Sequence, residues 1–156
     1  PFGRITYDEA IEKLHKKRFK IKWGVDFGFN EERALAKEFG KPVFVYAYPK
    51  EIKAFYCKMY KENPKLVMSA DLIVPKIGEL ATGGSRIDDK EELINRLKEF
   101  GLKEKDYDWY IDLRRYGTTP HVGFGLGVER LLAWMLDLEN VMDTIPFPRT
   151  MRRFYP

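Results

Sequence analysis

The residues best suited to chemistry lie in a glycine-rich stretch at residues 120–132. Three glycines occupy alternate positions, and they are Gly123, Gly125 and Gly127. This alternation predicts an extended strand that a large flat ligand can approach, because glycine has no side chain to hold the ligand away. The apolar run that follows has helical spacing and places Arg130 on the first turn of a helix, where an anion is favoured. A guanidinium there suits phosphate, and pairing with a nearby acid is the equal alternative.

A second cluster, at residues 78–86, places Glu79, Thr82 and Arg86 around two consecutive glycines. The carboxylate of Glu79 suits Mg²⁺, which takes one or two carboxylates together with phosphate oxygens and waters. The guanidinium of Arg86 can fork onto a carboxylate or bind a side-chain amide oxygen. The spacing alone favours a hairpin corner with solvated charges over a binding site.

Further residues with chemical potential stand elsewhere in the chain. Lys53 and Tyr56 are three positions apart, so on a strand they share a face only where a bulge or bend intervenes. A surface pair on an edge strand is the ordinary interpretation of these two. His121 is the second of two histidines and directly precedes the glycine stretch. Arg114 and Arg115 are more typical of solvated or paired side chains than of a catalytic site.

The elements that must position these residues include four predicted helices. Thr6 and Glu9 form a capping box at the start of the first helix. Asn30 is expected to cap a second helix over residues 31–39, and Asp88 with Glu91 to cap a third that ends before Gly101. A further helix is expected over residues 106–115, and the proline-rich segment 145–149 is expected to be irregular.

The predicted strands are β-branched and aromatic runs joined by short turns, at residues 43–48, 54–59, 66–74 and 77–82. Strands in close succession indicate an antiparallel sheet. With the glycine strand and the helices, the pattern predicts one α+β domain with an antiparallel sheet flanked by helices on one face.

Composition limits the class of protein. The chain has 156 residues, 44% hydrophobic and 33% charged, which suits one soluble domain. A net charge of +4 permits a nucleic-acid partner without arguing for one. The sole cysteine, Cys57, excludes an intrachain disulfide and a thiolate metal site. With no signal peptide or membrane-spanning run, we expect a cytoplasmic protein without a membrane partner, and the start at Pro1 suggests a partial polypeptide.

The glycine stretch and its surroundings resemble a known family. Residues 120–132 resemble motif 3 of the class II aminoacyl-tRNA synthetases, in the aspartyl/asparaginyl branch, and residues 112–127 read D-L-R-R-Y-G-T-T-P-H-V-G-F-G-L-G. The form is closest to the archaeal-type asparaginyl enzymes, and the closing F-P-R at 147–149 is also similar. The resemblance extends along nearly the whole chain. It implies the C-terminal part of a class II catalytic core, with motifs 1 and 2 and an anticodon-binding barrel upstream of Pro1.

The resemblance also implies roles for individual residues. It assigns Arg130 and Glu79 to catalysis, with Arg130 on the γ-phosphate of ATP and Mg²⁺ on Glu79 and Thr82. It assigns ATP binding to Glu79, Thr82, His121, Gly125, Gly127 and Arg130. It assigns the amino acid to Lys53, Tyr56, Arg86 and Gly123. The implied partners are ATP, Mg²⁺, asparagine or aspartate, tRNA and a second subunit in a homodimer.

The implied activity is ATP-dependent activation of asparagine to an adenylate and its transfer to tRNA. Three alternatives stay open: a tRNA-independent asparagine synthetase, an aspartyl-tRNA synthetase and a non-catalytic paralogue. Ala54 favours asparagine, whereas the spacing T-G-G-S-R at 82–86 is nearer the aspartyl form. The 156 residues alone are expected to form no adenylate, because the motif 2 arginine would be missing, and to expose an open apolar sheet edge.

Overall fold

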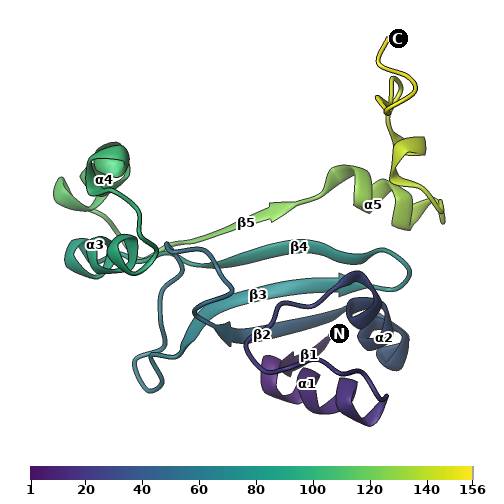
Figure 1. The fold of residues 1–156 in the computed structure, drawn as a ribbon, viewed down its shortest axis with the longest axis horizontal. Helices are drawn as coiled ribbons and strands as arrows, with labels where there is room; N and C mark the ends of the chain where they lie inside the picture. The colour runs from purple at the N-terminus through teal and green to yellow at the C-terminus, as the bar shows by residue number, and fades with distance from the viewer. Residues whose placement is uncertain (156) are drawn as a thin grey trace.

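The computed structural model describes residues 1–155, and its centre is a five-stranded sheet flanked by helices (Figure 1). In order across the sheet, the strands are β1 (Gly3–Thr6), β2 (Val43–Pro49), β3 (Leu66–Val74), β4 (Gly78–Ser85) and β5 (Val122–Leu126). β1 is parallel to β2, and each later pair of neighbours is antiparallel. The sheet is therefore mixed, and the wholly antiparallel sheet predicted from the sequence was wrong at one edge. β1 was missed because four residues leading straight into a helix leave no alternating pattern.

The helices cover one face of the sheet and both of its ends. They are α1 (Tyr7–Lys16), α2 (Phe29–Phe39), α3 (Lys90–Glu99), α4 (Asp108–Arg115) and α5 (Val128–Met135), with 3-10 helices η1 (Glu104–Tyr107) and η2 (Val141–Thr144). α1 packs on β2, and α2 packs on β3 and β4. α3 and α4 lie together beyond one end of the strands, whereas α5 continues from β5 at the other end (Figure 1). Within residues 1–155, no helix combines the length and apolar character needed to cross a bilayer.

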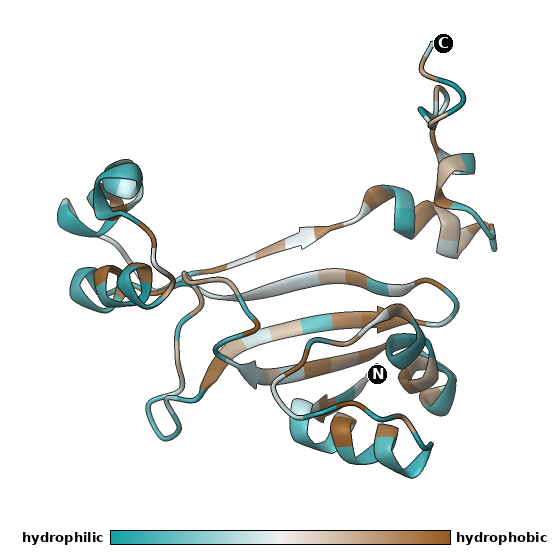
Figure 2. Ribbon diagram, viewed as in Figure 1, coloured by the Kyte–Doolittle hydropathy of each residue, from teal (hydrophilic) through white to brown (hydrophobic). Residues whose placement is uncertain are grey.

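The main core lies between α1, α2 and the sheet, where hydrophobic residues follow β2 and β3 (Figure 2). The capping box of Thr6 and Glu9 is confirmed, and it starts α1 so that Tyr7 is fully buried. The Tyr7 ring stacks on Phe27 with centroids 5.1 Å apart. This packing brings the loop that carries Asp26 to the sheet face where the charged residues gather.

The predicted strand at residues 54–59 was wrong. This segment is a loop that touches the sheet through two isolated bridges, Cys57 to Arg86 and Met59 to Val67. Its aromatic character serves packing instead of strand pairing, since Phe55 packs against the small core formed by α3 and α4. High β-propensity often reflects such packing requirements rather than a preference for the ladder itself.

The starts of two helices also differ from the prediction. α2 begins two residues earlier than expected, after Gly28, so Asn30 lies inside it. α3 is capped by Asp89, whose side chain accepts from the Glu92 N–H, because the neighbouring Asp88 is taken by an ion pair with Lys58. Segment 145–149 has no helix or strand, as expected.

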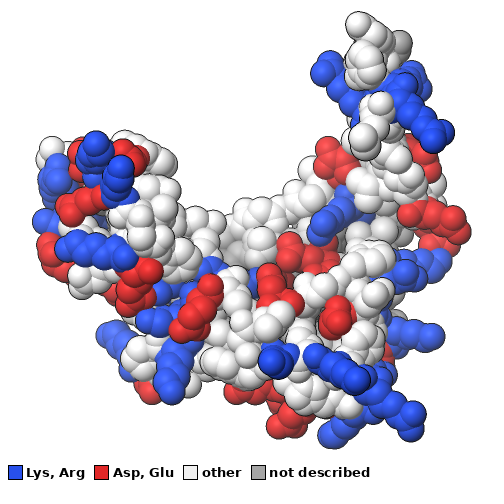
Figure 3. All heavy atoms as spheres, in the orientation of Figure 1, with Lys and Arg blue, Asp and Glu red and all other residues white. Residues whose placement is uncertain are grey.

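β5 forms an edge of the sheet, and its apolar side chains are largely exposed. Val122 and Phe124 are 69% and 76% exposed. Figure 3 shows a hollow, mostly uncharged surface between the α3–α4 end and the C-terminal segment. An open apolar strand edge is a template for pairing with another chain, so self-association of the isolated 156 residues stays a prediction.

Candidate active site

A pocket of about 340 Å³ lies between β4 and the loop at residues 52–57. Six of the residues singled out in the sequence line it, namely Lys53, Tyr56, Glu79, Thr82, Arg86 and Gly125. Glu79 and Thr82 are three positions apart and share the pocket because the β3–β4 register shifts at Leu80, which has no partner on β3. Such a bulge re-aims a side chain on an otherwise alternating strand. We call this space the inner pocket.

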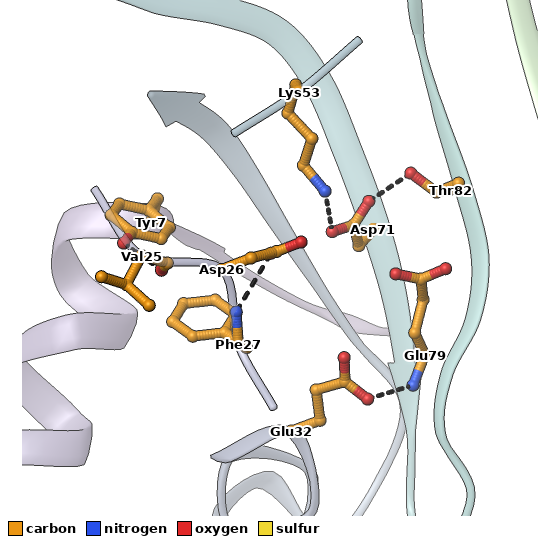
Figure 4. A network of polar contacts seen from close by, with 9 residues as sticks. All are labelled: Tyr7, Val25, Asp26, Phe27, Glu32, Lys53, Asp71, Glu79 and Thr82. Carbon is orange, nitrogen blue, oxygen red and sulfur yellow. Dashed lines mark hydrogen bonds and ion pairs between the residues drawn. The ribbon is translucent and has the colours of Figure 1, made fainter. Parts of the chain in front are cut away.

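Asp71 binds two of the side chains that line the inner pocket, Lys53 and Thr82 (Figure 4). Lys53 Nζ lies 2.6 Å from one carboxylate oxygen of Asp71, and the Thr82 hydroxyl donates to the other. Asp71 is 3% exposed, and the Lys53 ammonium also lies 4.0 Å from the centre of the Tyr48 ring. These contacts fix the Lys53 side chain in place even though Lys53 lies in a loop.

Asp71 was missed in the sequence. Its signal was a single acidic residue inside the otherwise uncharged strand 66–74, L-V-M-S-A-D-L-I-V. A charge is rarely buried unless it is paired, so an acid at such a position indicates a partner elsewhere in the chain. The identity of that partner, Lys53, could not be read from the sequence because the two residues lie on different elements.

At the far end of the inner pocket, the guanidinium of Arg86 is held between a ring and a backbone. Its Cζ lies 4.4 Å from the centre of the Tyr56 ring. On the β5 side, a Cβ placed on Gly123 would lie 2.5 Å from Arg86 Nη2. Arg86 makes no ion pair within residues 1–155. Its guanidinium is therefore fixed in position and free to bind an incoming oxygen. The spacing in the sequence had instead favoured a hairpin corner with solvated charges.

Gly123→Ala in the full-length protein should displace Arg86 without unfolding the chain. The clash falls on the end of a flexible side chain, and φ at Gly123 is not positive. We expect a melting temperature close to wild type. For the amino-acid substrate that the family resemblance implies, we expect a KM raised about 10-fold, because a charge-assisted hydrogen bond is weakened. Steady-state kinetics and thermal unfolding of the variant check this. An unchanged KM would show that Arg86 does not depend on the gap at Gly123.

A second pocket of about 380 Å³, the outer pocket, is lined by Arg130 and Lys76 and by four acids, namely Asp26, Glu32, Glu79 and Glu139. Glu79 lines both pockets, so the two meet there. Figure 3 shows acidic side chains gathered near the middle of the face in view. The outer pocket therefore joins one guanidinium to a group of carboxylates.

The backbone of Glu79 is held from two sides. Its N–H donates to the Glu32 carboxylate at 2.8 Å (Figure 4), and its carbonyl accepts from Arg130 Nη1. The Glu79 carboxylate has no hydrogen-bond or ion-pair partner within the described residues. Arg130 lies on the first turn of α5, as predicted, but it binds a carbonyl instead of the acid that the alternative required.

Burial raises the pKa of Glu79 above its usual value of 4.5, and Asp71 raises it further, whereas Lys53 and Arg130 lower it. Burial also raises the pKa of Glu32, and the hydrogen bond from the Glu79 N–H opposes this rise. Two carboxyls that resist ionisation in the same place are electrostatically prepared for a cation.

These raised pKa values predict how stability changes with pH. The folded state holds these protons more tightly than the unfolded state. The contribution of the protonated carboxyls to the free energy of unfolding is therefore greatest below pH 4.5, and it is lost as the pH rises through the raised pKa of Glu79. Glu79→Gln mimics the protonated form, so the variant should melt higher than wild type at neutral pH and lose less stability as pH rises from 4.5. Thermal unfolding across this range checks it. If the variant melts at a lower temperature than wild type at neutral pH, the charged Glu79 carboxylate does not destabilise the folded state and the prediction is wrong.

Two of the predicted ATP residues lie outside both pockets. His121 is exposed, donates from Nδ1 to the Thr119 carbonyl at 2.8 Å, and stands at the end of β5 opposite Arg130. Gly127 is the N-cap of α5, where a Cβ would lie 3.3 Å from the Arg130 side chain. The structure therefore does not bring His121 to Arg130.

The arginine pair on α4 is structural, as its pattern suggested. Arg114 is 7% exposed, donates from Nε to the Ile87 carbonyl at 2.9 Å and stacks on Tyr110. Arg115 forms an ion pair with Asp112. Neither lines the inner or the outer pocket.

The sheet, the glycine strand leading into α5 and the two joined pockets define a class of protein. A family model described as tRNA synthetases class II (D, K and N) matches residues 1–151, and the chain belongs to this family. This confirms the family that the sequence resembled.

Individual relatives show how similar the chain is to known members. An asparagine–tRNA ligase of Pyrococcus abyssi is 54% identical over 100% of this chain and 36% of its own length. The structure of asparaginyl-tRNA synthetase from Pyrococcus horikoshii complexed with asparaginyl-adenylate has a TM-score of 0.96 and 52% identity, covering 100% of this chain and 36% of that one. An aspartyl-tRNA synthetase of Entamoeba histolytica has a TM-score of 0.94 and 32% identity, covering 100% and 33%. The chain thus spans about 36% of the length of the curated relatives it matches.

Proposed function

We propose that the chain is part of an ATP-dependent asparagine–tRNA ligase and holds the amino acid and the pyrophosphate end of ATP. The observation that carries the proposal is the pair of pockets joined at Glu79, with Arg86 at one end and Arg130 at the other. An aminoacyl adenylate needs these features in series: a site for the side chain, then a site for phosphate charge.

The inner pocket suits the amino acid. Arg86 is positioned to donate to an oxygen of the substrate side chain, and Tyr56 holds the guanidinium flat. Because Lys53 is paired with Asp71, its charge is already compensated, and a neutral amide fits beside Arg86. The higher identity to asparaginyl than to aspartyl relatives, 52% against 32%, also supports asparagine.

The phosphates belong at the Glu79 end. Arg130, at the start of α5, would offset charge on the departing pyrophosphate. On β5, a Cβ at Gly125 would meet no atom within 4 Å, so the strand leaves a flat surface for adenosine there. The chain's contribution to the reaction is to hold the substrate carboxylate in line with the α-phosphorus and the leaving group. Such positioning is the main source of rate in phosphoryl chemistry.

Mg²⁺ fits the same place. Within residues 1–155 no group of three or more His, Cys, Asp or Glu side chains could hold a metal, but Mg²⁺ takes one or two carboxylates and completes its shell with phosphate oxygens and waters. The unpartnered Glu79 carboxylate suits it best, whereas the Thr82 hydroxyl is engaged by Asp71. Bound there, the ion would neutralise phosphate charge.

The remaining partners follow from the family. The full-length protein would pass the activated asparagine to tRNA, and we expect it to act as a homodimer in the cytoplasm. Sedimentation of the full-length protein and aminoacylation of tRNA test these two expectations.

The decisive assay is ATP–pyrophosphate exchange by the full-length protein with asparagine and aspartate side by side. We expect exchange with asparagine. Aspartate-dependent exchange that yields asparagine on adding ammonia without tRNA would identify the tRNA-independent synthetase instead. Aspartate-dependent charging of tRNA would identify the aspartyl enzyme, and no exchange with either amino acid would identify a non-catalytic paralogue.

A further inference from the structure

Ser69, in the middle of β3, carries a buried hydroxyl that no group within residues 1–155 satisfies. The residue is 3% exposed. A buried hydroxyl without a hydrogen-bond partner lowers the stability of the folded chain, so each such group calls for an explanation. Alanine would fill this position without the penalty.

The pairing of β3 explains why Ser69 has no partner. The β2–β3 register shifts between Tyr46 and Tyr48, so Ser69 has no paired residue on β2. On the other side it faces Gly84, which has no side chain, and a Cβ there would lie 3.2 Å from the Ser69 Cβ. The hydroxyl is therefore left free on both sides by the strands themselves.

The position of Ser69 connects it with the inner pocket. Three buried side-chain groups lack a partner in the described chain, at Tyr48, Ser69 and Arg96, and of these three residues Ser69 alone lines the inner pocket. Its alternation along β3 puts it on the same face as Asp71. Its pairing with Gly84 places it next to the bridge between Cys57 and Arg86, which is the end of the pocket away from Arg130.

We propose that Ser69 is a further binding residue for the amino-acid side chain, with its hydroxyl oxygen accepting a hydrogen bond from the amide NH₂ of asparagine. Arg86 donates to the amide oxygen, so the two residues grip the two halves of one amide. A side-chain amide needs both an acceptor and a donor to be satisfied when it is buried, and these two groups supply them. This inference rests on the proposed function and names the group that holds its substrate.

The test compares Ser69→Ala with Ser85→Ala in the full-length protein. Ser85 lies on β4, is not part of the inner pocket and serves as a matched control. For Ser69→Ala we expect the asparagine KM in pyrophosphate exchange to rise about 3- to 10-fold, with the ATP KM and kcat close to wild type. The melting temperature without ligands should be equal to or above wild type, because an unsatisfied polar group has been removed. Ser85→Ala should leave the asparagine KM unchanged.

A merely structural hydroxyl would behave differently. It would lower the melting temperature of Ser69→Ala and leave the asparagine KM unchanged, and either result would overturn the proposal. Ser69→Cys provides a second variant of similar size, in which a weaker hydrogen-bonding group should raise the KM by an intermediate factor. If the wild type shows no asparagine-dependent exchange, the proposed function fails together with this ligand; if the wild type is active and Ser69→Ala keeps its KM, the role of Ser69 alone fails.

Discussion

Arg130→Ala in the full-length protein is expected to lower asparagine-dependent ATP–pyrophosphate exchange about 10²-fold or more. The expected size is that of removing one preorganised charge contact from a transition state. Arg130 lies where α5 begins and reaches Glu79, so it sits at the junction of the two pockets. The fall should appear in kcat, because the charge on the leaving group develops during the reaction.

Two further variants separate a charge effect from a structural one. Arg130 also holds the Glu79 carbonyl, so its loss could disturb Glu79 indirectly. Arg130→Lys keeps the charge and should retain more activity than the alanine variant. Arg115→Ala, which removes an arginine paired with Asp112 outside both pockets, should exchange at the wild-type rate. A near-normal exchange rate for Arg130→Ala would show that Arg130 has only the structural role of binding the Glu79 carbonyl.

Asp71→Ala is expected to destabilise the folded protein by about 3–5 kcal/mol, the usual effect of breaking a buried ion pair. Lys53, with a side chain only 11% exposed, would keep a buried charge without its partner, and the Thr82 hydroxyl would lose its acceptor. Denaturant unfolding followed by a tertiary-structure signal measures the loss.

The double variant Lys53→Met with Asp71→Leu tests the cause. Replacing both members of a buried pair with apolar residues is often neutral, so most of the lost stability should return. Asp112→Ala, which breaks the exposed pair with Arg115, serves as the control and should change stability by about 0.5 kcal/mol or less. A double variant as unstable as the sum of the two single variants would show that the residues act independently.

Features governed by neighbouring residues were predictable from the sequence. The capping box of Thr6 and Glu9 needs only a spacing of three, and the structure confirms it. The glycine strand leading into the helix that carries Arg130 is equally local, and both elements are present where the pattern placed them. Strand 66–74 was also predicted with its observed bounds, because its apolar run is long and bounded by turns.

Features that depend on partners from elsewhere in the chain were not predictable. Segment 54–59 resembles a strand but packs on α3 and α4, which no local pattern reveals. The sequence favoured Asp88 as the cap of α3, but Asp88 forms an ion pair with Lys58 and Asp89 caps the helix instead. Asp71 and Ser69 enter the site only through strand register, with its shifts at Leu80 and between Tyr46 and Tyr48.

The proposed function is tested most directly by a crystal structure of the full-length protein with a non-hydrolysable analogue of asparaginyl-adenylate. From the proposed function we expect the asparagine side chain at Arg86, the phosphate mimic at the Glu79 junction and the adenosine along β5 at Gly125. An analogue bound outside the inner pocket, or bound with its phosphate mimic at Arg86, would contradict the proposed function.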